Sequence, residues 1–144
     1  MLISTGLRNS ILVKLASEFE DGVTAEIEIF KGTVPATADA LVSASDLLGT
    51  VQNTGATALT FGAPSAGVLS KSTDESWTVT PTATGIATFY RLVIAADDKS
   101  LSTTAMRVQG TVDTANADML VDSTTFTISE PRTVSSFSIG MPSS

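Results

Sequence analysis

The 144-residue sequence contains no cysteine and no histidine. The lack of cysteine excludes disulfide bonds and leaves the redox compartment open. The lack of histidine removes the side chain that proteins use most often as a general base and as a metal ligand. The usual nucleophile–base triads of hydrolases therefore cannot be assembled from this chain.

Charged residues are also scarce, at 16% of the chain, and the net charge is −7. The eight basic residues are spread singly from Arg8 to Arg132. A phosphate-binding face needs a cluster of Lys and Arg, so the composition argues against direct nucleic-acid binding. No apolar run reaches the ~20 residues that span a bilayer, and Met1 to Thr5 lacks the pattern of a secretion signal. We expect no membrane partner.

What the chain has is apolar residues, at 42%, and a mean hydropathy of +0.27. This content is ample for a core, and the length fits one domain over residues 1–144. Serine and threonine make up roughly a quarter of the chain, which is typical of β-sheet surfaces.

The longest apolar run, Ile86–Ala95, is rich in aromatic and β-branched residues and apolar on both faces. It favours a strand covered on both sides over an edge strand or a helix. One face would carry Phe89, Arg91 and Val93, and the other Thr88, Tyr90, Leu92 and Ile94. We expect the first face in the inter-sheet core, and a helix, a long loop or a second copy over Tyr90 and Leu92. Arg91 should reach a carboxylate or the sheet rim, because a buried unpaired guanidinium is costly.

Residues 5–18, approximately, have the periodicity of an amphipathic helix that Ser4 or Thr5 can cap. Gly22 would end it. The helix would cover its own sheet or dock on a neighbouring chain, and the first alternative is favoured because most amphipathic helices pack within their own chain. Its apolar positions are Leu7, Ile11, Leu12, Leu15, Ala16 and Phe19.

Residues 24–142, approximately, read as about eight short strands with frequent turn signals. The clearest alternation runs from Ala25 to Ile29. Residues 76–80 and 86–95 would form a hairpin, and Gly110 would mark a bulge. No βαβ rhythm appears. The predicted fold is therefore mainly β: an antiparallel two-sheet β-sandwich of jelly-roll type with one N-terminal amphipathic helix.

Residues that could support chemistry form no convincing site. Ser70 and Lys71 are adjacent on a predicted strand and so point to opposite faces. Asp113, Asp118 and Asp122 bracket one turn but lack the spacing of a calcium loop. Trp77, Phe89 and Tyr90 could form a stacking platform for a sugar or for single-stranded nucleic acid, and the simpler interpretation is that they anchor the core. We predict no catalytic residues, no cofactor and no metal, and interpret the chain as a structural or binding module.

Several stretches are informative by their order and spacing: Ser4–Asn9, Ile29–Ala40, Leu59–Gly62, Gly67–Lys71, Glu75–Trp77, Ala87–Arg91, Arg107–Val112, Ala117–Met119 and Ile139–Pro142. Together they resemble the capsid cement (decoration) proteins of tailed bacteriophages and prophages, including those of short-tailed Bordetella phages. The resemblance spans nearly the whole chain.

The resemblance implies a non-enzymatic jelly-roll virion protein, made in the host bacterial cytoplasm. It would bind, as a homodimer, the outside of an icosahedral shell of major capsid protein and stabilise that shell against packaged DNA. Another virion component, such as a tail or collar adaptor, and a carbohydrate-binding β-sandwich remain alternatives; a carboxylate-based hydrolase ranks last. The residues predicted to face a partner are Met1, Leu2, Ile3, Tyr90, Leu92, Met141 and Pro142.

Overall fold

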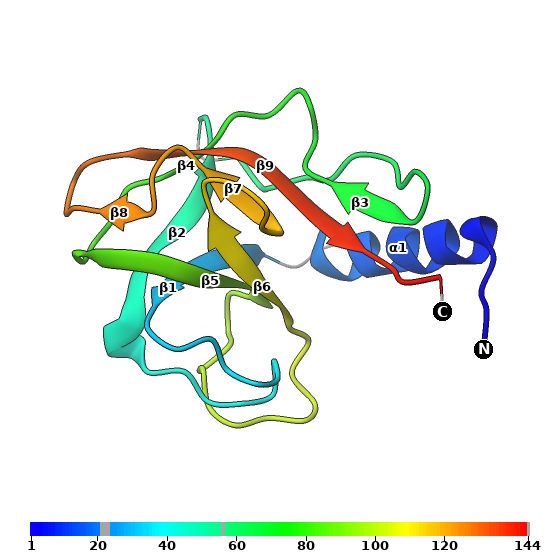
Figure 1. Ribbon diagram of the computed structural model, residues 1–144, viewed down its shortest axis with the longest axis horizontal. Helices are drawn as coiled ribbons and strands as arrows, with labels where there is room; N and C mark the ends of the chain where they lie inside the picture. Colours follow the sequence, from blue (N-terminus) through cyan, green and yellow to red (C-terminus); the bar gives the residue numbers. More distant parts are fainter. Residues whose placement is uncertain (21–23, 56, 144) are drawn as a thin grey trace.

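The computed structural model describes residues 1–20, 24–55 and 57–143. Gly22, predicted to end the helix, lies outside the described residues. The fold is mainly β with one N-terminal helix (Figure 1). The elements are α1 (Thr5–Glu20), β1 (Ala25–Lys31), the 3-10 turn η1 (Ala44–Asp46), β2 (Leu47–Asn53), β3 (Val68–Ser70), β4 (Trp77–Val79), β5 (Gly85–Ile94), β6 (Val108–Asp113), β7 (Met119–Val121), β8 (Thr125–Phe126) and β9 (Arg132–Gly140).

The strands close into a seven-stranded barrel. Around the ring the order is β1-β2-β4-β9-β7-β6-β5, and β5 then pairs with β1 to complete it. The β6–β7 pair is parallel and the other pairs of the ring are antiparallel. The prediction of a two-sheet jelly-roll sandwich is therefore wrong. The sandwich prediction failed because β1 pairs with β2 on one edge and with β5 on the other. This second pairing joins the two ends of the sheet into a ring, so the described residues form no second sheet.

The predicted hairpin between residues 76–80 and 86–95 is also wrong. Strand β4 pairs with β2 and β9, whereas β5 pairs with β1, β6 and β8. The segment between β4 and β5 is bound elsewhere: the Thr82 backbone N–H donates to Leu48 O at 2.8 Å, and the Ser129 N–H donates to Pro81 O at 3.0 Å. The segment therefore does not form a tight turn, and β4 and β5 do not pair with each other.

Gly110 does not mark a bulge, because residues 108–111 of β6 pair with β5 in continuous register. Instead the glycine makes room for a core side chain. A Cβ atom at this position would lie 2.6 Å from the Tyr90 hydroxyl oxygen and 2.8 Å from Asp118 Oδ2. A glycine occurs at position 110 because the Tyr90 side chain packs closely against the strand, and not because the strand is irregular there.

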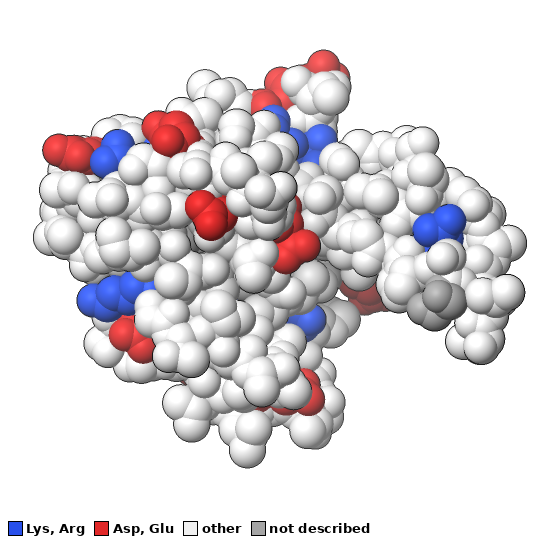
Figure 2. All heavy atoms as spheres, viewed as in Figure 1, with Lys and Arg blue, Asp and Glu red and all other residues white. Residues whose placement is uncertain are grey.

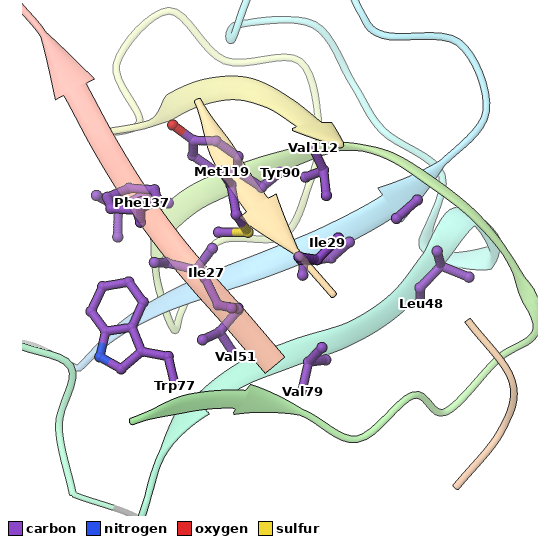
Figure 3. Packing of buried hydrophobic residues seen from close by; sticks show 14 of the residues in the cluster. Ile27, Ile29, Leu48, Val51, Trp77, Val79, Tyr90, Val112, Met119 and Phe137 are labelled. Atoms are coloured by element: carbon purple, nitrogen blue, oxygen red, sulfur yellow. The ribbon is translucent and has the colours of Figure 1, made fainter. Parts of the chain in front are cut away.

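The barrel interior holds the main hydrophobic core (Figure 3). Trp77, Phe137 and Tyr90 form its aromatic part, with ring centroids 5.6 Å apart for Trp77–Phe137 and 5.1 Å for Tyr90–Phe137. Ile27 and Ile29 of β1 face them with no exposed surface, as their alternation with glutamates predicts. Tyr90 and Leu92 of β5 thus lie inside the barrel.

The opposite face of β5 is covered by two loops, residues 33–43 and 96–107. Phe89 stacks on Phe30 with ring centroids 5.1 Å apart, and Val42 of the first loop closes this small cluster. The predicted cover of a helix, a long loop or a second copy over Tyr90 and Leu92 is therefore wrong, because those side chains lie in the barrel core and loops cover the Phe89 face instead. Both faces are apolar in sequence, so the period alone does not show which one faces inward.

Helix α1 covers little of the barrel. Ser4 caps it, accepting a hydrogen bond from the Leu7 N–H at 3.2 Å. Phe19, at its C-terminal end, joins the barrel core. Leu12 and Ala16 instead pack with Leu69 of β3 in a separate cluster, and the N-terminal turns project away from the barrel (Figure 1).

Candidate interaction surfaces

The two ends of the chain meet at the projecting end of α1. The Ile3 N–H donates to Ser143 O at 3.1 Å, and Arg8 Nη1 donates to Met141 O at 3.2 Å. Met141 N–H donates in turn to Gly67 O at 2.8 Å. The predicted partner-facing residues Met1–Ile3 and Met141–Pro142 are therefore brought together on one part of the molecule.

Gly67 is the centre of this joint. Its N–H donates to Asn9 Oδ1 at 2.8 Å, and its φ of +79° is one that side-chain-bearing residues rarely adopt. A Cβ atom there would lie 2.3 Å from Arg8 Nη1. Only glycine lets the Arg8 guanidinium lie against the turn. Stretches Ser4–Asn9, Gly67–Lys71 and Ile139–Pro142, separate in sequence, thus form one contact.

We call residues 1–20 together with β3 and residues 138–143 the arm. Large apolar side chains are exposed along its N-terminal part, with Leu2 82% and Leu7 50% exposed. Ile11, one turn after Leu7, extends this surface along α1, and Val13 is exposed on another side of the helix. The arm shows few charged atoms on the face seen in Figure 2. Such a concentration of exposed apolar surface is typical of an interaction site. It also corrects the predicted helix face, because Leu7 and Ile11 do not cover the chain's own sheet.

A groove of about 310 Å³ lies between the C-terminal half of α1 and the start of β6. Leu15 and Phe19 line it from the helix, and Met106 and Val108 line it from the other side. The apolar surface of the arm therefore continues toward the barrel.

Two of the residues predicted to face a partner are not at the surface. Tyr90 is 1% exposed and Leu92 is fully buried, both within the barrel core. Burial raises the pKa of the Tyr90 hydroxyl well above its ordinary value, and the nearby Asp118 carboxylate adds to this effect. Trp77 is fully buried as well. The side chains that were considered as a sugar platform therefore cannot stack on a ligand in this fold.

The second candidate surface is formed by the two loops that cover β5, residues 33–43 and 96–107. Beneath these loops, charged residues lie on the outer face of the barrel. Glu28 of β1 and Arg91 of β5 are paired across neighbouring strands, as are Arg91 and Gln109 of β6. Loop residue Lys99 reaches Glu28, with Nζ to Oε1 at 2.6 Å. Burial nevertheless holds the pKa of Glu28 above its ordinary value. Asp97 and Arg107 form a second buried ion pair, at 2.5 Å, and this contact lowers the pKa of the Asp97 carboxyl.

Arg91 reaches no carboxylate in an ion pair among the described residues, and its 1% exposure keeps it from the open rim of the sheet, so the prediction that it reaches one or the other is wrong. Its Nε donates to Gln109 Oε1 at 3.0 Å, and its two other nitrogen atoms are buried without a hydrogen-bond partner in the described part of the chain. Burial, with Arg107 nearby, lowers the pKa of this guanidinium. Arg91 therefore places a poorly compensated charge beneath the two loops.

We expect Arg91→Met to stabilise the protein by roughly 1–3 kcal/mol, because it removes a desolvated charge and keeps the length of the side chain. Urea unfolding of the purified variant measures this. Glu130→Gln, which removes an exposed partner of Arg132, is the control and should change stability by no more than about 0.5 kcal/mol. A loss of stability in Arg91→Met would show that the guanidinium is better compensated than its contacts indicate.

The remaining candidates for chemistry are engaged in local structure. Asp118 accepts hydrogen bonds from the Thr111 N–H and hydroxyl, and Asp122 accepts one from the Thr133 N–H. Lys71 donates to the carbonyl oxygens of Ser72 and Glu75. Within residues 1–20, 24–55 and 57–143, no group of three or more Asp or Glu is placed to hold a metal ion.

Comparisons of the chain with protein-family models, curated proteins and solved structures found no match. Among the described helices, none has the length and apolar character needed to cross a membrane.

Proposed function

We propose that this chain is a structural virion protein that binds the outside of an icosahedral phage capsid and cements its major capsid protein subunits. The observation that carries the proposal is the arm. Five of the twelve large apolar side chains that are exposed in the described residues belong to its first 13 residues: Met1, Leu2, Leu7, Ile11 and Val13.

The arm suits a docking role because it is fixed before it binds. The bonds of Arg8, Asn9 and Gly67 hold α1 against β3 and the C-terminal segment. A fixed apolar surface loses little conformational entropy on association, so more of its burial contributes to affinity. The closed ring also leaves its seven strands without the free edges along which sheet proteins aggregate.

Cementing follows from mass action. A protein that binds two neighbouring subunits of an assembled shell, and not free subunits, shifts the equilibrium toward the shell. The many copies that symmetry provides multiply this effect, so weak contacts suffice to oppose the pressure of packaged DNA. We propose a homodimer on the capsid surface, with the major capsid protein as partner, and no enzymatic activity.

Three of the stretches that resemble cement proteins support the proposal in a specific way. Ser4–Asn9, Gly67–Lys71 and Ile139–Pro142 contribute to the joint that fixes the arm. The arm carries six of the twelve large apolar side chains that are exposed in the described residues, so these stretches position the surface that would dock. Trp77 and Tyr90 are buried, and no observation favours the carbohydrate-binding alternative.

The test is the copy number of the chain in purified particles, measured by quantitative mass spectrometry against the major capsid protein. The proposal expects the chain to copurify with intact shells in numbers comparable to that protein. Shells that lack the chain should open at a lower temperature or a milder osmotic shock. A few copies per particle, located at the tail, would contradict the proposal and favour a tail or collar adaptor.

A further inference from the structure

The two loops that cover β5 form one unit, which we call the pad: residues 33–43 and 96–107. Their middle parts run antiparallel. The Val42 N–H donates to Lys99 O at 3.0 Å, and the Ser102 N–H donates to Asp39 O at 2.9 Å. These bonds place position 40 opposite position 101, so the two loops form a single surface.

Two side-chain contacts attach the pad to the barrel. Lys99 is paired with Glu28, and Gln109 Nε2 donates to Pro35 O at 2.8 Å. Within the pad itself, the Arg107 side chain, only 2% exposed, is paired with Asp97 and also donates to Ser100 O at 2.9 Å. The pad is therefore held in one conformation before any partner arrives.

These contacts pair the basic groups of the pad with carboxylates and leave two other carboxylates exposed. Within residues 33–43 and 96–107, all of which the structure describes, the basic side chains are Lys99 and Arg107, and both are engaged in ion pairs with carboxylates. Asp97 is used in the same way. The remaining carboxylates, Asp39 and Asp98, belong to exposed residues. The Ser100 N–H and hydroxyl both donate to Asp98 Oδ1 and lower the pKa of this carboxyl, which keeps the group ionised. The exposed carboxylates Asp39 and Asp98 therefore give the outside of the pad an acidic character.

The same outer surface is apolar at its centre. Leu101 is 70% exposed and Leu41 is 65% exposed, and the pairing of the two loops puts them on adjacent segments. Val34 and Met106 add further exposed apolar surface. Beneath the loops lie the ion pairs of Glu28 and Asp97 and the Phe30–Phe89 stack, while Leu41 and Leu101 stay at the surface.

We propose that the pad is a docking surface for an amphipathic helix of a protein partner, with an apolar face bordered by lysine or arginine side chains. Leu41 and Leu101 would pack against the apolar face, and Asp39 and Asp98 would face the basic border. Nucleic acid and anionic lipid are disfavoured, since their phosphates would face the same carboxylates. The inference goes beyond the capsid role and does not depend on it, because Leu41, Leu101, Asp39 and Asp98 all lie outside the arm.

The experiment uses the full-length protein and a synthetic amphipathic helical peptide made of leucine and lysine as the probe. Backbone amide NMR spectra are recorded during the titration. We expect shift changes concentrated in residues 39–42 and 98–102, and weaker binding as the salt concentration rises. Leu41→Ser combined with Leu101→Ser should weaken binding at least about tenfold, since each buried leucine is worth roughly that factor.

Ile128→Ser is the matched control. Ile128 is an exposed aliphatic residue outside the pad and the arm, so this variant should bind the peptide like the wild type. Shift changes centred on the arm, no shift changes on the pad, or unchanged affinity in the double variant would each overturn the inference. None of these results alters the copy number in particles, which tests the capsid role separately.

Discussion

Replacing Trp77 with alanine should lower the free energy of unfolding by about 3–5 kcal/mol, the cost of truncating a large aromatic side chain in a packed core. Trp77 is fully buried, lies 5.6 Å from Phe137 and 6.1 Å from Phe61 by ring centroids, and donates its indole N–H to Glu75. Domains of this size have a total stability of roughly 5–15 kcal/mol, so the loss is a large fraction of the whole. Urea unfolding followed by circular dichroism measures it.

Trp77→Phe is the matched variant, because it keeps a ring in the same cavity and should lose clearly less stability than Trp77→Ala. The comparison also decides between two roles for this side chain. A Trp77→Ala protein that unfolds at the wild-type urea concentration would show that Trp77 is not a core residue, and would reopen the sugar-platform interpretation.

Asp97→Asn should cost roughly 3 kcal/mol at neutral pH, because it leaves the guanidinium of Arg107 buried without a counter-charge. Both side chains of the pair are at most 5% exposed. Asp98→Asn removes the same charge one residue further along, where the side chain is exposed, and should change stability much less. Unfolding curves of the two variants and the wild type at pH 7 make the comparison.

The same pair gives a pH dependence with a defined sign. The pKa of Asp97 is lowered in the folded protein by its hydrogen bonds to Arg107. Its contribution to stability is therefore complete above the ordinary pKa of aspartate and is lost as the pH falls below about 4 toward the lowered pKa. The stability difference between wild type and Asp97→Asn should shrink over this range. A difference that stays constant down to pH 2.5 would mean that the pair does not stabilise the fold.

The ionisation of Glu28 affects the pH dependence of stability in the opposite direction to that of Asp97. Burial raises its pKa, so the folded protein holds a proton on this group more tightly than the unfolded chain does. Acidification through the raised pKa therefore favours the folded state at this residue. The Lys99–Glu28 contact thus reduces, but does not cancel, the cost of placing this carboxylate beneath the pad.

Local structure could be predicted from the sequence where one period dominates. The helix predicted over residues 5–18 is α1 (Thr5–Glu20), and the run Ile86–Ala95 is β5 (Gly85–Ile94). The alternation of Ile27 and Ile29 with glutamates places both isoleucines in the core. These signals are short-range, and they depend only on how a helix or a strand presents its side chains.

Strand partners could not be predicted, because period-2 patterns do not say which strand lies beside which. Nothing in β1 shows that it pairs with both β2 and β5, and this double pairing alone turns a sheet into a barrel. The parallel β6–β7 pair was missed for the same reason. Tyr90 is buried because the barrel closes around it. The prediction that Tyr90 faces a partner depended on the sandwich fold and is wrong for the same reason.

The candidate surfaces were partly visible in the sequence. Met1–Ile3 and Met141–Pro142 were chosen as apolar ends, and the structure brings them together. The exposure of Leu7 and Ile11 was not foreseen, since α1 is apolar on several sides and its period does not single out the buried one. The pad was missed entirely, because Leu41 and Leu101 lie 60 positions apart in stretches that read as loops.

The central claim is that the arm binds this protein to the outside of a capsid, and a cryo-EM map of the intact particle tests it most directly. We expect the seven-stranded barrel to fit density on the outer surface of the shell, repeated with its symmetry, with Leu7 and Ile11 of α1 against the major capsid protein. A map that shows the barrel at the tail, or that leaves the arm facing solvent on every copy, would contradict the account.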